Sequence, residues 1–133
     1  MPHLGAWAIL PSGILGFLVG GLWYGPIFGK AWAAARGMTP QMKQGANMVL
    51  IFGLTFLLNL FSSAVLFHVM GRVGVDNIHL AIMVAGGAAL GFIIPAMAVN
   101  YLFSRMSLKL FLIDAGYWLV IYHLMGLLLF YLR

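Results

Sequence analysis

Cysteine is absent from this 133-residue chain, and Asp76 and Asp114 are its only carboxylate side chains. Without cysteine, the protein can form no disulfide, bind no metal through thiolates and carry out no thiol redox chemistry. Charged residues make up only 7% of the sequence, whereas soluble globular domains contain roughly a quarter. The scarcity of charge excludes an ordinary water-soluble domain.

Apolar residues predominate in the sequence. They form 64% of the sequence, and the mean hydropathy is +1.06. We therefore expect an integral membrane protein with one transmembrane domain over residues 1–133 and no soluble catalytic domain attached. The first apolar stretch has no basic region before it and no small-residue cleavage site after it, so we do not expect a removable signal peptide.

Long apolar runs divide the chain into membrane spans. A helix rises about 1.5 Å per residue and must cross a hydrocarbon core of about 30 Å. Four runs are long enough, and they cover Leu4 to Tyr24, Met48 to Met70, Ile78 to Phe103 and Leu108 to Tyr131. None shows the alternation of a membrane β-strand. The expected fold is all-α, an antiparallel bundle of four transmembrane helices.

Basic residues predict how this bundle is oriented. With four spans, the 25–47 and 104–107 loops lie on one side, and both termini lie on the other side with the 71–77 loop. The first side carries Lys30, Arg36, Lys43, Arg105 and Lys109, and the second carries Arg72 and Arg133. The bias places the first side in the cytoplasm and both termini outside. Lys30, Arg36, Arg105 and Lys109 should meet lipid headgroups, so the net charge of +5 needs no nucleic-acid partner.

The first cytoplasmic loop is the only sizeable segment outside the spans. Gly25-Pro26 is a turn signal at its start. Apolar residues then recur at helical spacing opposite Lys30, and these are Ile27, Phe28, Ala31 and Trp32. The spacing predicts a short interfacial helix, with Trp32 at headgroup level. Further on, Thr39 can cap a helix that has Pro40 at its first position, so span two is expected to begin near Pro40.

Small residues form stripes in two of the spans. They recur every four residues, as Ser12, Gly16 and Gly20 in span one and as Ala81, Ala85 and Ala89 in span three. Such stripes allow helix backbones to approach closely. Packing inside one bundle is the favoured interpretation, and an oligomer interface is the alternative. Pro11 and Pro95 predict kinks, because each removes a backbone donor from its helix.

Polar residues form a stripe on span two. Thr55, Asn59, Ser62 and Ser63 recur at spacings of three and four, which places them on one helix face. An amide near mid-bilayer needs hydrogen-bond partners, so this face should not meet lipid. The stripe is either interhelical bonding or one wall of a polar pathway for an ion or solute.

Asp114 is the only carboxylate inside a predicted span. Such a group costs a few kcal/mol and usually faces a partner or a wet cavity. It lies about 8 Å deeper than Lys109, at a level that Asn100 of span three also reaches. Because the connection between spans three and four is short, we expect Asn100 to meet Asp114. Lys30, Arg105, Tyr24 and Tyr117 could also reach this level. The pair is either a structural polar contact that holds the helices together or an ion, proton or ligand site.

Metal and catalytic signals are weak. His3, His68, His79 and His123 all fall in the outer half of the predicted topology, where His68, His79 and His123 are weak candidates for metal ligands. No nucleotide-binding loop, zinc-protease motif or nucleophile elbow is present. One carboxylate without a second acid or base on its face is a thin basis for catalysis. The sequence indicates no cofactor and favours a protein that is not an enzyme.

Two signatures carry a family resemblance. They are GLWYGPIFGKAW at residues 21–32 and SLKLFLIDAGYW at residues 107–118, supported by GAN at 45–47 and NYLF at 100–103. Together they resemble the bacterial membrane family DUF1761 over nearly the whole chain. The resemblance implies a small four-span protein of a bacterial inner membrane, with no established activity, cofactor or catalytic residue. Members often have Asn where this chain has Asp114, which implies that the common function does not require the charge.

The leading hypothesis is an oligomeric bundle, similar to a channel or transporter, that binds or passes a small ion or solute at a polar site in its inner half. Asn100 and Asp114 form that site. The alternative is an accessory or scaffold subunit that packs on a partner membrane protein. A weaker third hypothesis is an enzyme or binder acting on lipid near Lys30, Trp32 and Asp114.

Overall fold

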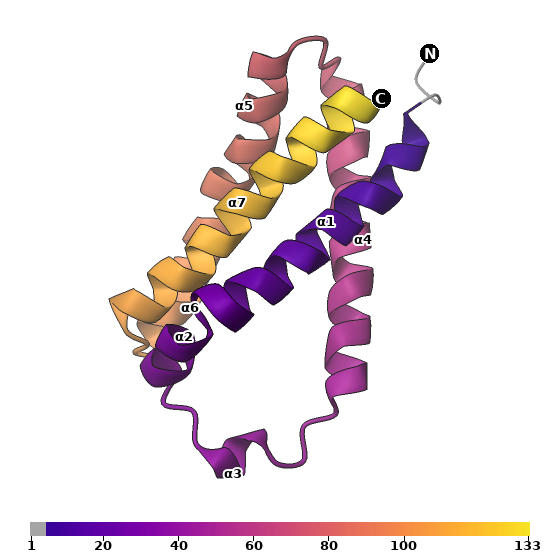
Figure 1. Ribbon diagram of the computed structural model, residues 1–133. Coiled ribbons are helices and arrows are strands. Elements are labelled where there is room, and N and C mark those ends of the chain that lie inside the picture. The colour runs from indigo at the N-terminus through magenta and orange to yellow at the C-terminus, as the bar shows by residue number, and fades with distance from the viewer. Residues whose placement is uncertain (1–4) are drawn as a thin grey trace.

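The computed structural model describes residues 5–133, which form helices joined by turns, with no strand among them (Figure 1). Four helices are long and apolar enough to cross a membrane, and they run over Ala6–Ile27, Met48–Val73, Ile78–Phe103 and Leu108–Leu132. The prediction of an all-α, four-span membrane fold is confirmed. Leu4, where the sequence places the start of span one, and His3, which it places in the outer half, lie outside the described residues.

Span one consists of η1 (Ala6–Ala8), α1 (Ile9–Leu22) and η2 (Trp23–Ile27). Spans two and four are the single helices α4 (Met48–Val73) and α7 (Leu108–Leu132). Span three is divided into α5 (Ile78–Ala88), η3 (Ala89–Ile93) and α6 (Ile94–Phe103). The π-helical η3 ends just before Pro95, which is in the first turn of α6. Proline has no backbone N–H to donate, and its ring clashes with the preceding turn of a regular helix. The wider π-helical turn accommodates the proline, so the helix is interrupted where the sequence predicts a kink.

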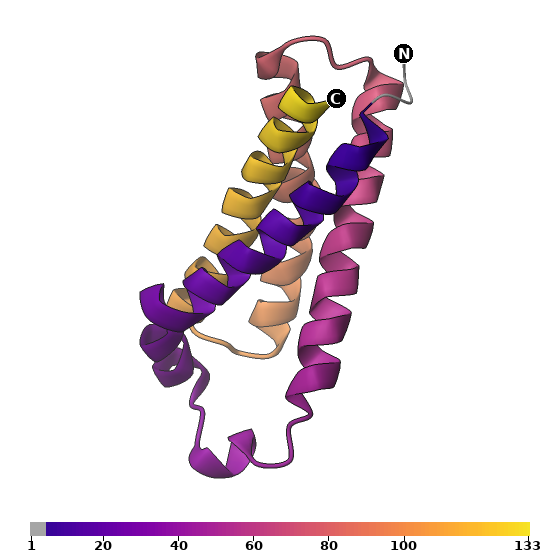
Figure 2. The same cartoon turned by 45° about the vertical axis from the view of Figure 1, so that its right-hand side comes forward.

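All four spans contribute side chains to one buried core, which includes Ala8, Leu66, Ala81 and Met125. Helix α1 packs against both α4 and α7, and α7 packs in turn against α5 and α6. Figures 1 and 2 show the start of span one, the end of α7 and the α4–α5 turn at one end of the molecule, which we call the terminal end. The first loop and the α6–α7 turn lie at the opposite end, which we call the loop end.

The first loop holds α2 (Gly29–Arg36) and α3 (Pro40–Lys43). The Thr39 side chain accepts a hydrogen bond from the Met42 backbone N–H, which confirms the predicted cap, but α3 ends after one turn. Span two begins later, at Met48, where the Asn47 side chain caps it. The prediction that span two begins near Pro40 is therefore wrong. Gly25 and Pro26 also do not form a turn, because the helix continues through them as η2.

Small residues bring the helices together inside the chain. Ala81, Ala85 and Ala89 are buried, and a Cβ added to Gly126 of α7 would lie 2.4 Å from the Ala85 Cβ. Helices α5 and α7 are therefore in backbone-level contact. Ser12 and Gly16 of α1 are likewise buried. Both stripes pack within the chain, as the favoured interpretation of the sequence predicts.

Candidate functional site

Asp114 accepts three hydrogen bonds from three different parts of the chain. Its Oδ1 atom accepts from the Tyr24 hydroxyl at 2.6 Å and from the Trp32 indole N–H at 3.1 Å. Its Oδ2 atom accepts from the Tyr101 hydroxyl. The carboxylate is 8% exposed. One side chain therefore ties span one, the first loop and span three to α7.

Aromatic packing positions the two donors from the first part of the chain. Because η2 continues span one, Trp23 reaches α7, and its indole N–H donates to the Ile113 carbonyl at 2.9 Å. The neighbouring Tyr24 ring packs edge-on against Tyr117, with 5.3 Å between ring centroids, and against Trp32, at 6.0 Å. These edge-to-face contacts are favourable. They fix both donors against the helix that carries the carboxylate.

The third donor is positioned by the end of α6. The Tyr101 carbonyl accepts a hydrogen bond from the Met106 N–H, and the Leu102 carbonyl accepts one from the Arg105 N–H. These two bonds, with Arg105 at a φ of 56°, form a Schellman motif in which a non-glycine residue takes the left-handed position. The motif closes a four-residue connection to α7. It thereby brings Tyr101 over Asp114, one turn before the chain reverses.

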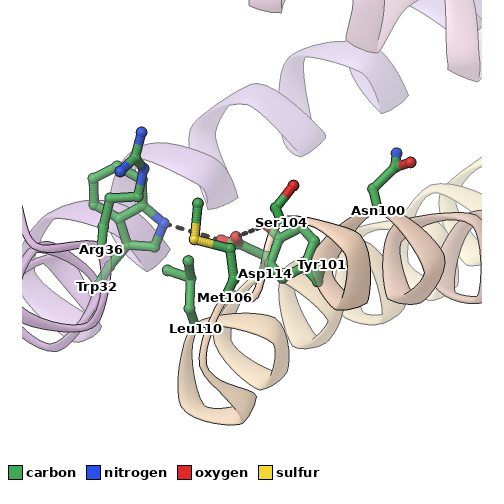
Figure 3. Close-up of a pocket in the computed structure, with 8 residues that line it drawn as sticks. All are labelled: Trp32, Arg36, Asn100, Tyr101, Ser104, Met106, Leu110 and Asp114. Carbon is green, nitrogen blue, oxygen red and sulfur yellow. Dashed lines mark hydrogen bonds between the residues drawn. The ribbon is translucent and has the colours of Figure 1, made fainter.

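Asn100 is not the partner of Asp114, contrary to the sequence expectation. Among the described residues it makes no hydrogen bond to the carboxylate, and its side chain is exposed. Figure 3 shows its amide turned away from Asp114 while Tyr101 reaches the carboxylate. Successive helix residues are separated by about 100°. The predicted pairing of spans three and four is confirmed, but the next residue, Tyr101, is the one that faces α7.

All three donors to Asp114 are neutral groups. No lysine or arginine within residues 5–133 forms a salt bridge with this carboxylate, and the basic residues of the loop end, Lys30, Arg36, Arg105 and Lys109, are exposed. Both carboxylate oxygens act only as acceptors, which is the bonding pattern of the ionised form. About four acceptor positions are available on such a group, so three donors leave room for one more. The carboxylate is therefore held by neutral donors alone, and the nearby Arg36, which lines the same pocket, forms no salt bridge with it.

A pocket with a volume of about 170 Å³ opens beside Asp114. Its lining comes from α2, α6, the α6–α7 turn and α7, and comprises Trp32, Arg36, Asn100, Tyr101, Ser104, Met106, Leu110 and Asp114. Figure 3 shows Asp114 between Trp32 and Tyr101, with the ends of Arg36, Ser104 and Asn100 extending toward one side. The volume is below the roughly 300–1,000 Å³ of drug-sized sites. It suits a small group.

The polar stripe of span two lies elsewhere, between α4 and α1. Ser63 donates to the Ile9 carbonyl at 2.9 Å, and Asn59 Nδ2 donates to the Thr55 carbonyl in its own helix at 2.9 Å. Thr55 is half-buried and donates to the Ile51 carbonyl, and Ser62 is half-buried. None of these four residues lines the pocket. The structure thus separates the candidate site residues into two groups.

Two buried polar atoms at this α1–α4 contact have no hydrogen-bond partner, Ser12 Oγ and Asn59 Oδ1. The Asn59 oxygen faces Gly16, where an added Cβ would lie 2.7 Å from it. The carbonyl of the same Gly16 accepts a hydrogen bond from the Tyr117 hydroxyl of α7 at 3.0 Å. The close approach leaves no space for a ligand beside Gly16. Of the polar stripe, Ser63 bonds to another helix, whereas Thr55 and Asn59 bond within α4.

Histidines do not gather into a metal site in the part of the chain that the structure describes. No group of three His, Cys, Asp or Glu residues there could hold a metal ion. His68 and His79 are exposed at the terminal end. His123 packs against α5, where its Nε2 atom would lie 2.6 Å from a Cβ added to Gly86.

Sequence reasoning placed Trp32 at the headgroup level and Tyr24 only within reach of Asp114, and it did not consider Tyr101. The signal that could have found Tyr101 is its position directly after Asn100, in the signature at residues 100–103. Tyr101 lies about 100° around the helix from Asn100, and its phenolic hydroxyl is a hydrogen-bond donor. Buried carboxylates near aromatic residues should therefore be tested against tyrosine and tryptophan donors first.

Comparison with protein-family models identifies the family of this chain. The family model described as a protein of unknown function (DUF1761) matches residues 7–130. No curated protein and no solved structure matches the chain. The match covers nearly all of the four spans and every residue of the Asp114 site, so the chain belongs to the DUF1761 family.

Proposed function

We propose that this protein binds a small cationic solute in the pocket at its loop end, with Asp114 as the residue that attracts the positive charge. The observation that carries the proposal is a buried carboxylate that accepts from three neutral donors, forms no salt bridge and lines an open pocket. Neutral donors hold the carboxylate in place but supply no positive charge to balance it. A cation about 4 Å away would gain about 4 kcal/mol at an effective dielectric constant of 20, before its desolvation cost.

The packing behind the pocket favours binding over passage through one chain. Between Asp114 and the terminal end, α7 presents Tyr117, Ile121, Met125 and Leu129, and each is at most 5% exposed. Polar solutes cross membranes along polar or water-filled surfaces. A channel or transporter of this family would therefore need a second copy of the chain, with the pathway between copies. We include such a homo-oligomer in the proposal, oriented by its basic residues with the pocket on the cytoplasmic side of a bacterial inner membrane.

Tryptophan fluorescence tests the binding step directly, because Trp32 lines the pocket and donates to Asp114. Purified protein in mild detergent is titrated with Na⁺, K⁺, methylammonium, ethanolamine and choline. We expect saturable quenching or a spectral shift with at least one of these cations. The response should be lost in Asp114→Asn and in Trp32→Phe but retained in Arg72→Gln, which changes an exposed charge at the terminal end. No response to any cation, or an equal response in Asp114→Asn, would overturn the proposal.

Passage across the membrane has a separate test in liposomes. If an oligomer passes the bound cation, flux should depend on Asp114 and fall in Asp114→Asn. Asn59→Leu tests the polar stripe of span two in the same assay. Flux that neither substitution alters, or absence of flux for every cation that binds, would restrict the protein to binding alone.

An accessory role is the second candidate function, and the exposure of α4 favours it. In the first half of α4, residues 48–58, Phe52 and Phe56 pack against Phe17 of α1, but other large apolar side chains are exposed, with Val49 85% exposed and Leu58 63% exposed. This face meets either lipid or another membrane protein. Affinity purification in mild detergent separates the two functions. A stoichiometric foreign partner supports the accessory role, whereas a homo-oligomer supports the transport proposal.

A further inference from the structure

The pocket has two charged residues of opposite sign that do not pair with each other. Arg36, on α2, lines it together with Asp114, on α7. No salt bridge joins them, and Asp76, the other acid of the chain, lies in the α4–α5 turn at the terminal end. Within residues 5–133 the guanidinium therefore has no acidic partner.

Hydrogen bonds and helix position keep the two charges apart. The carboxylate is fixed by Tyr24, Trp32 and Tyr101. Arg36 lies one helical turn after Trp32 and is exposed at the rim, where Figure 3 shows its guanidinium extending away from the carboxylate. The pocket thus has a negative position at its base and a positive position at its rim. Ser104 and Asn100, which point toward the same side, add a hydroxyl and an amide as neutral donors.

We propose that the ligand is a zwitterion, with an ammonium group that binds Asp114 and a phosphate or carboxylate group that binds Arg36. This inference rests on the proposed function and specifies its ligand class. An arginine guanidinium has a planar set of donors that matches phosphate and carboxylate oxygens, and hydrogen bonds between ionised groups are stronger than neutral ones. The Trp32 and Tyr101 rings beside the carboxylate suit an organic ammonium group, because aromatic faces attract cations.

Phosphoethanolamine has this chemistry in a size that fits a pocket of about 170 Å³, and it occurs both free and as a lipid headgroup. The lipid form has support from the surface next to the pocket. Leu102 and Phe103 lie beside the lining residues Tyr101 and Ser104 and are 77% and 87% exposed. They offer apolar contact for acyl chains while the headgroup occupies the pocket.

The test compares the zwitterion with its two halves. Detergent-purified protein is titrated with phosphoethanolamine, ethanolamine and inorganic phosphate, and binding is followed by tryptophan fluorescence and calorimetry. We expect phosphoethanolamine to bind at least about tenfold more tightly than either half. Arg36→Gln should bring its affinity down to that of ethanolamine, and Asp114→Asn should bring it down to that of phosphate. Arg72→Gln should retain the wild-type preference.

Each outcome separates this inference from the proposed function. If ethanolamine binds as tightly as phosphoethanolamine, or Arg36→Gln has no effect, the zwitterion inference fails while cation binding stands. If neither binds and the simple cations also give no response, both fail. Thermal unfolding of each variant shows that it is folded, and Arg36 is exposed, so its substitution should leave the unfolding temperature unchanged.

A titration with short-chain lipids distinguishes a lipid headgroup from a free zwitterion as the ligand. Short-chain dihexanoyl phosphatidylethanolamine is titrated below its micellar concentration beside free phosphoethanolamine and dihexanoyl phosphatidylglycerol, which lacks the ammonium group. Tighter binding of the ethanolamine lipid than of the free compound identifies a headgroup site. Equal binding identifies a soluble zwitterion. Equal binding of both lipids would contradict the requirement for an ammonium group and overturn the inference.

Discussion

The two halves of α7 are held in the bundle by different kinds of contact. Near the loop end, Asp114 bonds to long aromatic side chains from three other segments. Near the terminal end, Gly126 and Ala85 meet at backbone distance. Both kinds of contact join helices in membranes, where burial of apolar surface alone gives little preference for protein over lipid.

The difference explains why the pocket lies at one end only. A tyrosine or tryptophan side chain places its polar atom several ångströms from its backbone, so helices joined through such groups stay apart and leave space between them. Glycine has no side chain and alanine only a methyl group, so helices that meet through these residues pack closely and leave no space between them. The aromatic half can hold a ligand, whereas the small-residue half can only pack.

Removing the carboxylate should have the largest effect on stability. We expect Asp114→Ala to lower the free energy of unfolding by about 2–5 kcal/mol, because three donors lose their acceptor and each interhelical hydrogen bond contributes about 0.6–1.7 kcal/mol. Reversible unfolding by SDS in mixed micelles measures this change. Asp114→Asn is the control. Its carbonyl can accept from Tyr24 and Trp32 and its amide can donate to the Tyr101 hydroxyl, so it should cost less than about 1 kcal/mol. A loss as large in Asn as in Ala would show that charge, not bonding, holds this half of α7.

Adding one methyl group should disrupt the other half. Gly126→Ala places a Cβ 2.4 Å from the Ala85 Cβ, and overpacking of this kind costs about 1–3 kcal/mol. Gly87→Ala is the matched control on α5, because nothing lies within 4 Å of its added Cβ and alanine favours the helix. The same SDS titration should separate the two variants. Equal stability would mean that α5 and α7 do not depend on close contact there.

Tyr117 joins the two halves and allows a smaller test. Tyr117→Phe keeps the buried ring but removes the bond from its hydroxyl to the Gly16 carbonyl, which measures 3.0 Å. We expect a loss of about 0.5–1.5 kcal/mol. Tyr131→Phe should cost nothing measurable, because Tyr131 is 69% exposed. If Tyr131→Phe lowers the free energy of unfolding as much as Tyr117→Phe does, the hydrogen bond from Tyr117 to Gly16 of α1 cannot explain the loss.

The smallest expected effect is a gain in stability at the α6–α7 turn. Arg105 has a φ of 56°, which costs a non-glycine residue free energy that glycine does not pay. Arg105→Gly should therefore raise the free energy of unfolding by about 0.5–1 kcal/mol. It should leave ligand binding intact, because Arg105 does not line the pocket. A variant that is less stable than the wild type would indicate that the arginine side chain itself holds the turn.

The fold was largely predictable from the sequence, but the site was predictable only in part. The length of each apolar run gives the four spans, and Thr39 with Pro40 gives the start of α3. Asp114 stands out because no other carboxylate falls inside a span. Its partners could not be derived in the same way. Depth alone made Asn100 and Tyr101 nearly equivalent, and only the rotation of α6 about its axis separates them.

Taken alone, the sequence determined that this protein is a four-span helical membrane protein with one carboxylate in a span, because hydrocarbon excludes unpaired backbone groups and admits few charges. Only the tertiary structure decided which side chains meet that carboxylate. Tyr24, Trp32 and Tyr101 lie up to 90 positions away from it in sequence. Their convergence depends on the η2 extension, the return of α2 and the turn at Arg105, each of which is set by contacts between segments and not by local composition.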